Sequence, residues 1–386
     1  MKVKKKKITI AVFVDAFGYQ ILKEYEKKNK VFLQGRINHK RKLTSVLGFT
    51  NTCLPSILSG QYPNEHGQAG LFFHTAKSPF KYMRYLKHLP KILDRARVRN
   101  VVSKVVKKAH GFTGYFQLYS IPFDKLQYFD IMEKENYFKP NSPFNNLFDF
   151  VSSLNIEYHQ SDWEVSEDEN LKSLKEAMKN GKPRFSWLYL PSLDATLHMN
   201  GTKSNKIKDK IDSIDLELTK VLHIAEEEYE KVSLYVFSDH GMADVTKGVD
   251  IISKIDSLGL VYGVDYVAMY DSSMARFWTK NKIAKREITK KLNEVNDGKI
   301  LVESELIELK SDFKDSKFGD IVFLLNSGVM IEPSYFGKTK IPGMHGYHPK
   351  DPISDAILLS NKEIPKEVNS ITDIRNLLEW DILDEH

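Results

Sequence analysis

Four nearly continuous apolar runs, separated by long stretches of helical periodicity, constrain the fold of this 386-residue chain more than any other feature. Continuous apolar runs are typical of strands that are buried on both faces of a parallel sheet. They read "ITIAVFVD" at 8–15, "RFSWLYLP" at 184–191, "VSLYVFSD" at 232–239 and "AILLS" at 356–360. Helical patterns such as that of residues 205–229 lie between them. We therefore predict an α/β fold, a three-layer sandwich with a mainly parallel central sheet.

Two stretches interrupt this alternation. Residues 72–136 are rich in Lys, Arg and aromatic residues at helical spacing, and residues 262–325 follow the order strand, strand, helix, strand, strand. We predict a core of residues 1–261 and 340–386 with a basic helical insert at about 72–136, and an inserted α+β cap of residues 262–339. Both stretches are expected to lie over the active face, where Arg276 either contacts a phosphate or lies at the surface.

Charge and cysteine content limit the compartment and the partners. The 57 Lys and Arg against 51 Asp and Glu give a net charge of +6, which fits an anionic small molecule or surface better than a nucleic acid polymer. The single cysteine excludes an internal disulfide framework and favours a reducing cytoplasm.

Because no apolar run approaches the ~20 residues of a membrane helix, we expect a soluble or peripheral protein whose basic insert could contact a membrane. The sequence indicates no oligomeric state.

Carboxylates and imidazoles follow the ends of the predicted strands. Each alone is commonly a cap or a hydrogen-bonding group, but together they match the zinc, manganese or iron ligands of proteins. Six ligands are too many for one four-coordinate ion, so two ions are predicted, an arrangement typical of displacement at phosphorus. The carboxyl ends of parallel strands meet at one edge of a sheet, so we expect one shared site. The six residues are Asp15, Asp194, His198, Asp239, His240 and His345.

Four short motifs contain or accompany these residues: "SGQYPNEHG" at 59–67, "DATLH" at 194–198, "SDHGM" at 238–242 and "HGY" at 345–347. Together they resemble the alkaline phosphatase superfamily, and within it the type I phosphodiesterase/nucleotide pyrophosphatase branch. The resemblance implies an alkaline phosphatase-like core and a two-metal hydrolase of small phosphate esters or phosphoanhydrides. It also implies a phosphothreonine intermediate and two divalent ions, usually zinc, with manganese or magnesium in relatives.

The resemblance further divides the six ligands into two sets. One metal would be held by Asp194, His198 and His345. The other would be held by Asp15, Asp239 and His240, together with the oxygen of the nucleophile.

The segment "GFTNTCLPSILSG" at 48–60 offers four candidate nucleophiles, of which two are disfavoured. Cys53, followed by a proline and Ser56, imitates the sulfatase signature, but Ile57 stands where that signature needs arginine. We expect Cys53 to be a small buried residue and Ser56 to lie inside a helix. A sulfatase is accordingly a minor alternative.

The two threonines of this segment remain. An ungapped match of the family motif, counted back from Gly60, falls on Thr50, whereas Thr52 requires a two-residue deletion. We predict Thr50 as the nucleophile and as a metal ligand, at a helix N-terminus where it can cap the helix and where free amides favour a phosphoryl group. Asn51 is predicted to contact a phosphoryl oxygen. Thr52 stays open as the alternative nucleophile.

The same scaffold is compatible with other activities. A phosphomonoesterase or a phosphoethanolamine-type transferase would use the same metals. Monoesterases of this superfamily usually need an additional positive group near the nucleophile, and no arginine occurs between residues 42 and 84, which favours the diesterase. A non-catalytic binding protein is disfavoured because all six predicted ligands are present.

Overall fold

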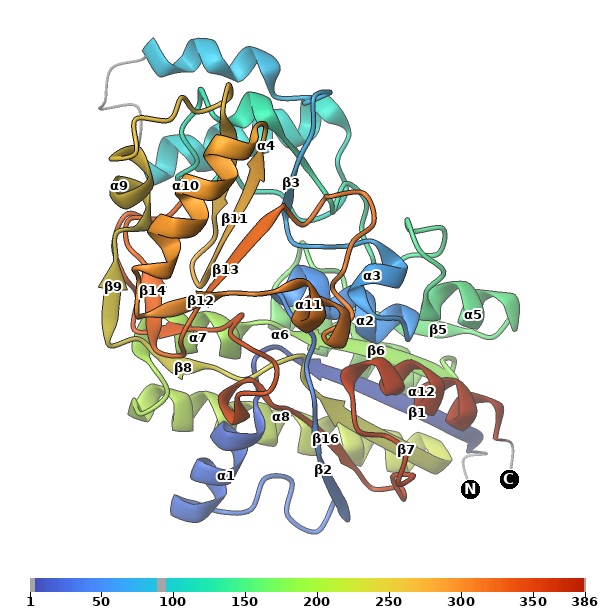
Figure 1. Ribbon diagram of the computed structural model, residues 1–386. Helices are drawn as coiled ribbons and strands as arrows, with labels where there is room; N and C mark the ends of the chain where they lie inside the picture. The colour runs from blue at the N-terminus through green and yellow to red at the C-terminus, as the bar shows by residue number, and fades with distance from the viewer. Residues whose placement is uncertain (1–3, 89–94, 385–386) are drawn as a thin grey trace.

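A six-stranded sheet forms the centre of the structure, a computed structural model that describes residues 4–88 and 95–384 (Figure 1). Its strands are β1 Lys5–Val14, β2 His39–Leu43, β5 Tyr158–Gln160, β6 Phe185–Leu190, β7 Tyr229–Phe237 and β16 Ala356–Ser360. Their order across the sheet is β2-β16-β7-β1-β6-β5. Strands β7, β1, β6 and β5 run parallel, whereas β16 is antiparallel to both of its neighbours. The predicted mainly parallel α/β sheet is confirmed.

The burial of strand β1 explains why the predicted runs are apolar throughout. Ile10 and Val12 point into one apolar cluster, and Ala11 and Phe13 point into a second cluster on the opposite face. Successive side chains of a strand alternate between faces, so a strand covered on both sides can hold few polar residues. All four predicted runs are strands of this sheet, and the run at 356–360 coincides with β16.

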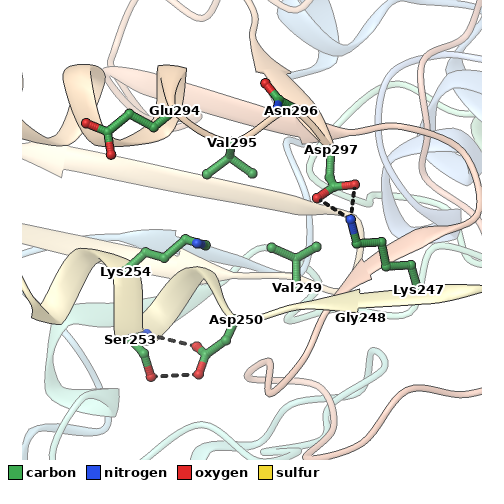
Figure 2. A pocket seen from close by; sticks show the side chains of 10 residues that line it. All are labelled: Lys247, Gly248, Val249, Asp250, Ser253, Lys254, Glu294, Val295, Asn296 and Asp297. Atoms are coloured by element: carbon green, nitrogen blue, oxygen red, sulfur yellow. Dashed lines mark hydrogen bonds and ion pairs between the residues drawn. The ribbon is translucent and has the colours of Figure 1, made fainter.

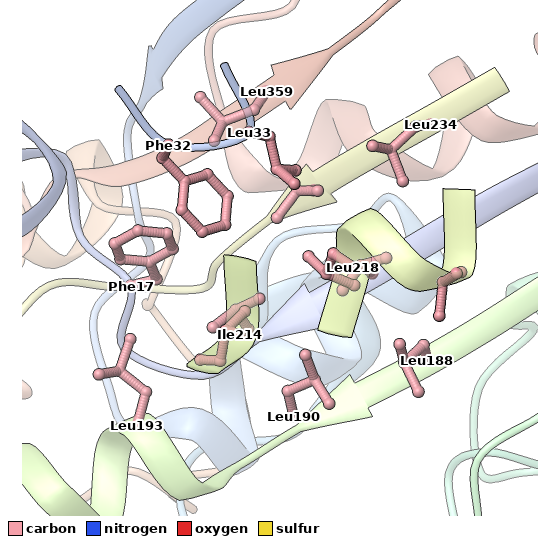
Figure 3. Packing of buried hydrophobic residues seen from close by; sticks show 14 of the residues in the cluster. Phe17, Phe32, Leu33, Leu188, Leu190, Leu193, Ile214, Leu218, Leu234 and Leu359 are labelled. Atoms are coloured by element: carbon pink, nitrogen blue, oxygen red, sulfur yellow. The ribbon is translucent and has the colours of Figure 1, made fainter. Parts of the chain in front are cut away.

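Helices cover both faces of this sheet (Figure 1). They are α1 Tyr19–Lys28, α6 Glu167–Lys179 and α8 Asn205–Glu228 on one face, and α2 Thr50–Ser59, α5 Leu147–Ser153 and α12 Ile374–Leu383 on the other. Figure 3 shows the first face, where Ile214 and Leu218 of α8 pack with Leu188 and Leu190 of β6. The three-layer architecture is therefore confirmed. None of the helices within the described residues is long and apolar enough to cross a lipid bilayer.

A second, smaller sheet lies beside the first one. Its antiparallel order is β10-β11-β13-β12. The bounds in this part of the chain are β8 Ala243–Asp244, β9 Lys247–Val249, α9 Ile251–Asp256, β10 Tyr266–Tyr270, β11 Met274–Thr279, α10 Lys282–Asn293, β12 Gly298–Ile300, α11 Glu303–Glu308, β13 Ile321–Leu325, β14 Val329–Ile331 and β15 Gly343–Met344. The predicted order strand, strand, helix, strand, strand is present, with the short helix α11 added between β12 and β13. The division into core and cap stays a prediction.

The basic insert is only partly helical. It contains β3 Phe72–His74, the 3₁₀ helix η1 Lys81–His88, α4 Ala96–His110, the 3₁₀ helix η3 Leu126–Tyr128 and β4 Phe129–Ile131. Strands β3 and β4 pair antiparallel at the two ends of the insert. Buried residues of the insert share one apolar cluster with those of the small sheet. The insert therefore packs against the small sheet.

Arg276 of β11 joins these two parts of the chain, which corrects both sequence-based interpretations of it. The side chain is 1% exposed, and its Nε lies 2.9 Å from Asp271 Oδ2. Its two terminal nitrogens donate to the backbone oxygens of Ala69 and Phe72, each at 3.0 Å. Arg276 therefore neither lies at the surface nor contacts a phosphate, because its donors are used inside the protein.

A buried carboxylate fixes α12 against the central sheet. Asp381 is 2% exposed and accepts hydrogen bonds from Thr9 Oγ1 at 2.5 Å, Ser233 Oγ at 2.9 Å and Tyr235 OH at 3.1 Å. Lys7 Nζ lies 3.4 Å from the same carboxylate. Because Asp381→Ala leaves these buried donors unpaired, we expect it to lower the free energy of unfolding by about 3 kcal/mol in denaturant titrations.

Asp384→Ala is the matched control for this prediction. Its carboxylate lies 3.9 Å from the same lysine but is 36% exposed, and exposed ion pairs contribute roughly 0–1 kcal/mol. Equal losses of stability in the two variants would contradict the structural role of Asp381.

Candidate active site and metal centre

The structure brings all six predicted ligands together at the carboxyl ends of β1, β6 and β7. They form two groups of three, and within each group the potential ligand atoms lie within 4.8 Å of one another. The first group is Asp15, Asp239 and His240, and the second is Asp194, His198 and His345. Residues that are up to 330 positions apart in the sequence thus meet at one edge of the sheet.

The register of the sheet places the first group. Phe13 of β1 pairs with Phe237 of β7, so Asp15 and Asp239 follow neighbouring strands at the same end. The chain turns sharply after β1, where Ala16 has a φ of 59° in the left-handed region. This turn lets Ala16 N donate to Asp239 Oδ1 at 3.2 Å. Backbone geometry therefore holds both carboxylates in place.

The second group is built on a short helix, α7 Ser192–Asn200, that follows β6. Asp194 and His198 are one turn apart on it, with His198 Nε2 at 3.3 Å from Asp194 Oδ1. His345 follows β15 and places its Nε2 3.7 Å from the same oxygen. The predicted common face of Asp194 and His198 is thus present.

Stacked imidazoles join the two groups. The ring centroids of His240 and His345 are 3.8 Å apart with planes at 12°, and the His198 ring is 5.1 Å from His345. Burial, followed by the neighbouring imidazoles of His240 and His198, lowers the pKa of His345 well below its usual value. His345 is therefore neutral near pH 7, the state in which histidine binds metals.

The unpartnered atoms of the site fit divalent cations. The Nδ1 atoms of His198 and His240 lie 2.8 and 3.0 Å from backbone carbonyl oxygens, which leaves each Nε2 free to face a carboxylate. Asp239 Oδ2 lies 3.0 Å from His240 Nε2 and has no well-aligned hydrogen-bond partner among the described residues. Asp194 Oδ1 and His345 Nδ1 are also buried without a hydrogen-bond partner. A cation between such lone pairs would satisfy them, and the donor set suits zinc or manganese.

The pKa shifts of the clustered side chains also favour a bound cation. Burial, and then the charges of Asp239 and Asp194, raise the pKa of Asp15 well above its usual value. Burial also raises the pKa of Asp194. For His240, burial lowers the pKa, but Asp239, Asp15 and Asp194 together outweigh it and raise the pKa to about 9. In the absence of a cation, bound protons therefore offset the negative charge of the clustered carboxylates.

Tyr189 of β6 is a site residue that the sequence analysis missed. Its hydroxyl donates to Asp15 Oδ2 at 2.9 Å, and its ring stacks on Phe13 at 5.1 Å. The register of β1 and β6 pairs these two residues. The sequence does contain a signal for this role, a tyrosine within an otherwise apolar run. A buried phenol needs a hydrogen-bond partner, so such a tyrosine indicates a polar group nearby.

Thr50 is the first residue of α2 and contacts the first group of ligands. Its Oγ1 lies 3.4 Å from Asp15 Oδ1 and 3.1 Å from His240 Nε2. The predicted capping role is wrong, because Phe49 occupies the N-cap position and no side chain caps this helix. The uncapped first turn of α2 has free backbone N–H groups, a favourable site for an anion. Asn51 lies in the same turn, and its Nδ2 is buried without a hydrogen-bond partner.

The other candidate nucleophiles are buried, and none of them hydrogen-bonds to the side chain of a candidate ligand. Thr52 is 1% exposed, its Oγ1 has no hydrogen-bond partner, and it packs beneath Gly48, where a Cβ would come within 2.7 Å of it. Cys53 is fully buried, which raises the pKa of its thiol well above the usual value. Ser56 lies inside α2 and contacts His66 Nε2 at 2.9 Å. His66 thus supports α2 and is not in either group of candidate ligands.

Aromatic rings from the insert and the cap border the site. The Phe49 ring lies edge-on to His345 at 5.6 Å, Phe336 stacks on Phe49 at 6.5 Å, and Tyr119 contacts Phe336 at 4.5 Å. Tyr119 belongs to the insert and Phe336 to the predicted cap. Both stretches therefore contribute to the surroundings of the ligands.

A hollow of about 580 Å³ lies elsewhere, between residues 247–254 and the segment that follows α10 (Figure 2). It is lined by residues 247–250, 253–254 and 294–297, and Lys247 Nζ lies 2.7 and 2.8 Å from the two carboxylate oxygens of Asp297 across it. None of the six candidate ligands lines it. This hollow does not belong to the candidate active site.

Comparisons with known proteins agree with the geometry. A family model described as type I phosphodiesterase / nucleotide pyrophosphatase matches residues 9–348. Human ectonucleotide pyrophosphatase / phosphodiesterase 5 has a similar structure, with a TM-score of 0.68 and 13% identity over 98% of this chain and 95% of that chain.

The murine protein of the same name gives a TM-score of 0.66 and 15% identity over 98% of this chain and 95% of that chain. An inactive threonine-to-alanine variant of the murine protein, in complex with AMP, gives the same values. At these identities the structural likeness shows the fold, and no curated protein sequence matches the chain.

Proposed function

The chain belongs to the type I phosphodiesterase / nucleotide pyrophosphatase family of hydrolases, and we propose that it is a two-metal phosphodiesterase that acts through a phosphothreonine on Thr50. The observation that carries this proposal is the position of Thr50 Oγ1, 3.4 Å from Asp15 Oδ1 and 3.1 Å from His240 Nε2. The hydroxyl thus lies at a helix N-terminus and beside one of two groups of candidate metal ligands.

Each residue of the site has a role in this proposal. Divalent ions held by the two groups would stabilise negative charge on the attacking and leaving oxygens. The first turn of α2 presents backbone N–H groups to the phosphoryl group, and Asn51 Nδ2 is a buried donor with no partner among the described residues. Tyr189 orients Asp15 through its hydrogen bond. The inactive threonine variant of the murine relative, solved with AMP, supports a threonine nucleophile and a nucleotide-like substrate.

A phosphomonoesterase or a phosphoethanolamine-type transferase is the second candidate on this scaffold. The structure disfavours the monoesterase because Arg276, the cap arginine considered as a phosphate ligand, is 1% exposed and bound to Asp271. The choice of zinc over manganese or magnesium, and a cytoplasmic location, stay predictions.

A panel of four aryl substrates tests the proposed activity. They are the nitrophenyl ester of thymidine monophosphate, bis-nitrophenyl phosphate, nitrophenyl phosphate and nitrophenyl sulfate. We expect kcat/KM for the two diesters to exceed that for the monoester and the sulfate by at least about tenfold, or about 1.4 kcal/mol in transition-state binding.

Protein carrying Thr50→Ala, purified in the same way, controls for contaminating hydrolases. Turnover of the monoester or the sulfate alone would contradict the diesterase. Transfer of the phosphoryl product to added ethanolamine in preference to water would identify a transferase instead.

A further inference from the structure

Two elements of the insert, η1 and α4, lie at the end of the molecule away from the six-stranded sheet (Figure 1). Neither element contains an acidic residue: their sequences are KYMRYLKH and ARVRNVVSKVVKKAH. One side of each element is anchored, since Met83 of η1 is buried and Val102 and Val106 of α4 pack against the same apolar cluster. Their outward sides therefore have fixed orientations.

Helix α4 is also held toward the active site. Arg99 is 5% exposed, and its Nη1 donates to the backbone oxygens of Tyr119 at 3.0 Å and Ile121 at 2.7 Å. Tyr119 contacts Phe336, one of the aromatic residues that border the candidate ligands. The inward face of α4 and the wall of the active site are thus parts of one packed unit.

The outward face of α4 combines aliphatic and basic side chains. Val101 is 61% exposed and Val105 is 63% exposed. Arg97, Lys104 and Lys108 are exposed as well. The spacing of these five residues, at 97, 101, 104, 105 and 108, places them along one side of a helix. The two exposed valines form a short apolar stripe, one helical turn long, which the three cations flank.

The outward side of η1 repeats this combination with aromatic residues. Tyr82 is 68% exposed and Tyr85 is 59% exposed. Lys81 Nζ lies 4.9 Å from the centre of the Tyr82 ring, and the guanidinium carbon of Arg84 lies 5.0 Å from that of Tyr85. Exposed tyrosines with adjacent cations are typical of side chains at the boundary between lipid headgroups and acyl chains.

We propose that the outward faces of η1 and α4 form a surface that docks on an anionic lipid membrane. Cations would bind the lipid headgroups, and the two valines and two tyrosines would enter the interface. A second copy of the chain is a poor partner because two such basic faces repel each other. A polynucleotide is also a poorer partner, since exposed valines offer no hydrogen bonds to phosphates or bases. The proposal does not rest on the hydrolase activity.

Vesicle flotation with the full chain tests this proposal. We expect binding to vesicles of phosphatidylcholine mixed with phosphatidylglycerol, no binding to phosphatidylcholine alone, and weaker binding at high salt. Arg97→Gln, Lys104→Gln and Lys108→Gln combined should weaken binding by about 100-fold, because each removed charge costs about fivefold. The matched control combines Lys282→Gln, Lys285→Gln and Lys290→Gln on exposed positions of α10, with the same change in net charge.

A second variant tests the apolar stripe. Val101→Ser combined with Val105→Ser keeps the charge, and we expect it to weaken vesicle binding while the thermal unfolding temperature stays near that of the wild type. Equal weakening by the α10 control, or no effect of the valine variant, would overturn the docking surface. Binding of polyuridylate without vesicle binding would assign the surface to nucleic acid. Dimerisation that the valine variant abolishes would assign it to a second copy of the chain.

Discussion

Replacing Thr50 by alanine is expected to lower kcat for diester hydrolysis by roughly a thousandfold or more, the usual cost of removing a nucleophile. The reason is geometric, because the hydroxyl lies 3.4 Å from Asp15 Oδ1 and 3.1 Å from His240 Nε2. Denaturing quench of the wild type with a phosphorus-labelled substrate should trap label on Thr50, which peptide mapping identifies. Thr50→Ser keeps a hydroxyl and should restore part of the activity.

Thr52→Ala is the matched control, two residues further along the same helix. Its Oγ1 is buried, has no partner and packs beneath Gly48, so we expect kcat within a few-fold of the wild type. If Thr52→Ala were as inactive as Thr50→Ala, or if Thr50→Ala kept normal turnover, the assigned nucleophile would be wrong.

The parts of the fold that could be predicted from the sequence depend on local pattern. A strand buried on both faces is apolar throughout, which identifies 8–15 and 356–360 without knowledge of their partners. The pairing of Phe72–His74 with Phe129–Ile131 has no such signal, because both strands are short and the contact spans the whole insert. The antiparallel direction of β16 likewise depends on its packing against β7, which the local sequence pattern does not indicate.

The candidate metal ligands could be identified from the sequence because few residue types bind divalent metals, and because their spacing along the chain is restricted. Asp194 and His198 could be placed on one face from helical geometry alone. The contact of Tyr189 with Asp15 required the register between β1 and β6, and the burial of Arg276 required Phe72 of the insert to pack against β11. These long-range contacts decide which polar residues serve structure and which face the site.

Removing divalent metal is the second change for which we expect a large effect. A chelator should abolish turnover, and zinc, manganese or magnesium added back should restore it. A ligand at a thousandfold excess over its Kd raises the free energy of unfolding by about 4 kcal/mol, so the metal-free protein should also unfold at a lower temperature. Elemental analysis should find about two metal equivalents per chain, and about one in His240→Ala, which leaves only the group of Asp194, His198 and His345 complete.

The release of protons on metal binding tests the candidate metal site independently of enzyme activity. The pKa of His240 is raised to about 9, so at pH 7 a metal must displace its proton, and affinity should fall about tenfold for each pH unit below 9. The raised pKa of Asp15 adds a further proton at lower pH, whereas the lowered pKa of His345 adds none near neutrality. Zinc titration at pH 7 should therefore release more protons than at pH 10, and this excess should shrink in His240→Ala. Fully active protein that contains no metal would exclude a role of metal at this site, and proton release independent of pH would contradict the raised pKa of His240.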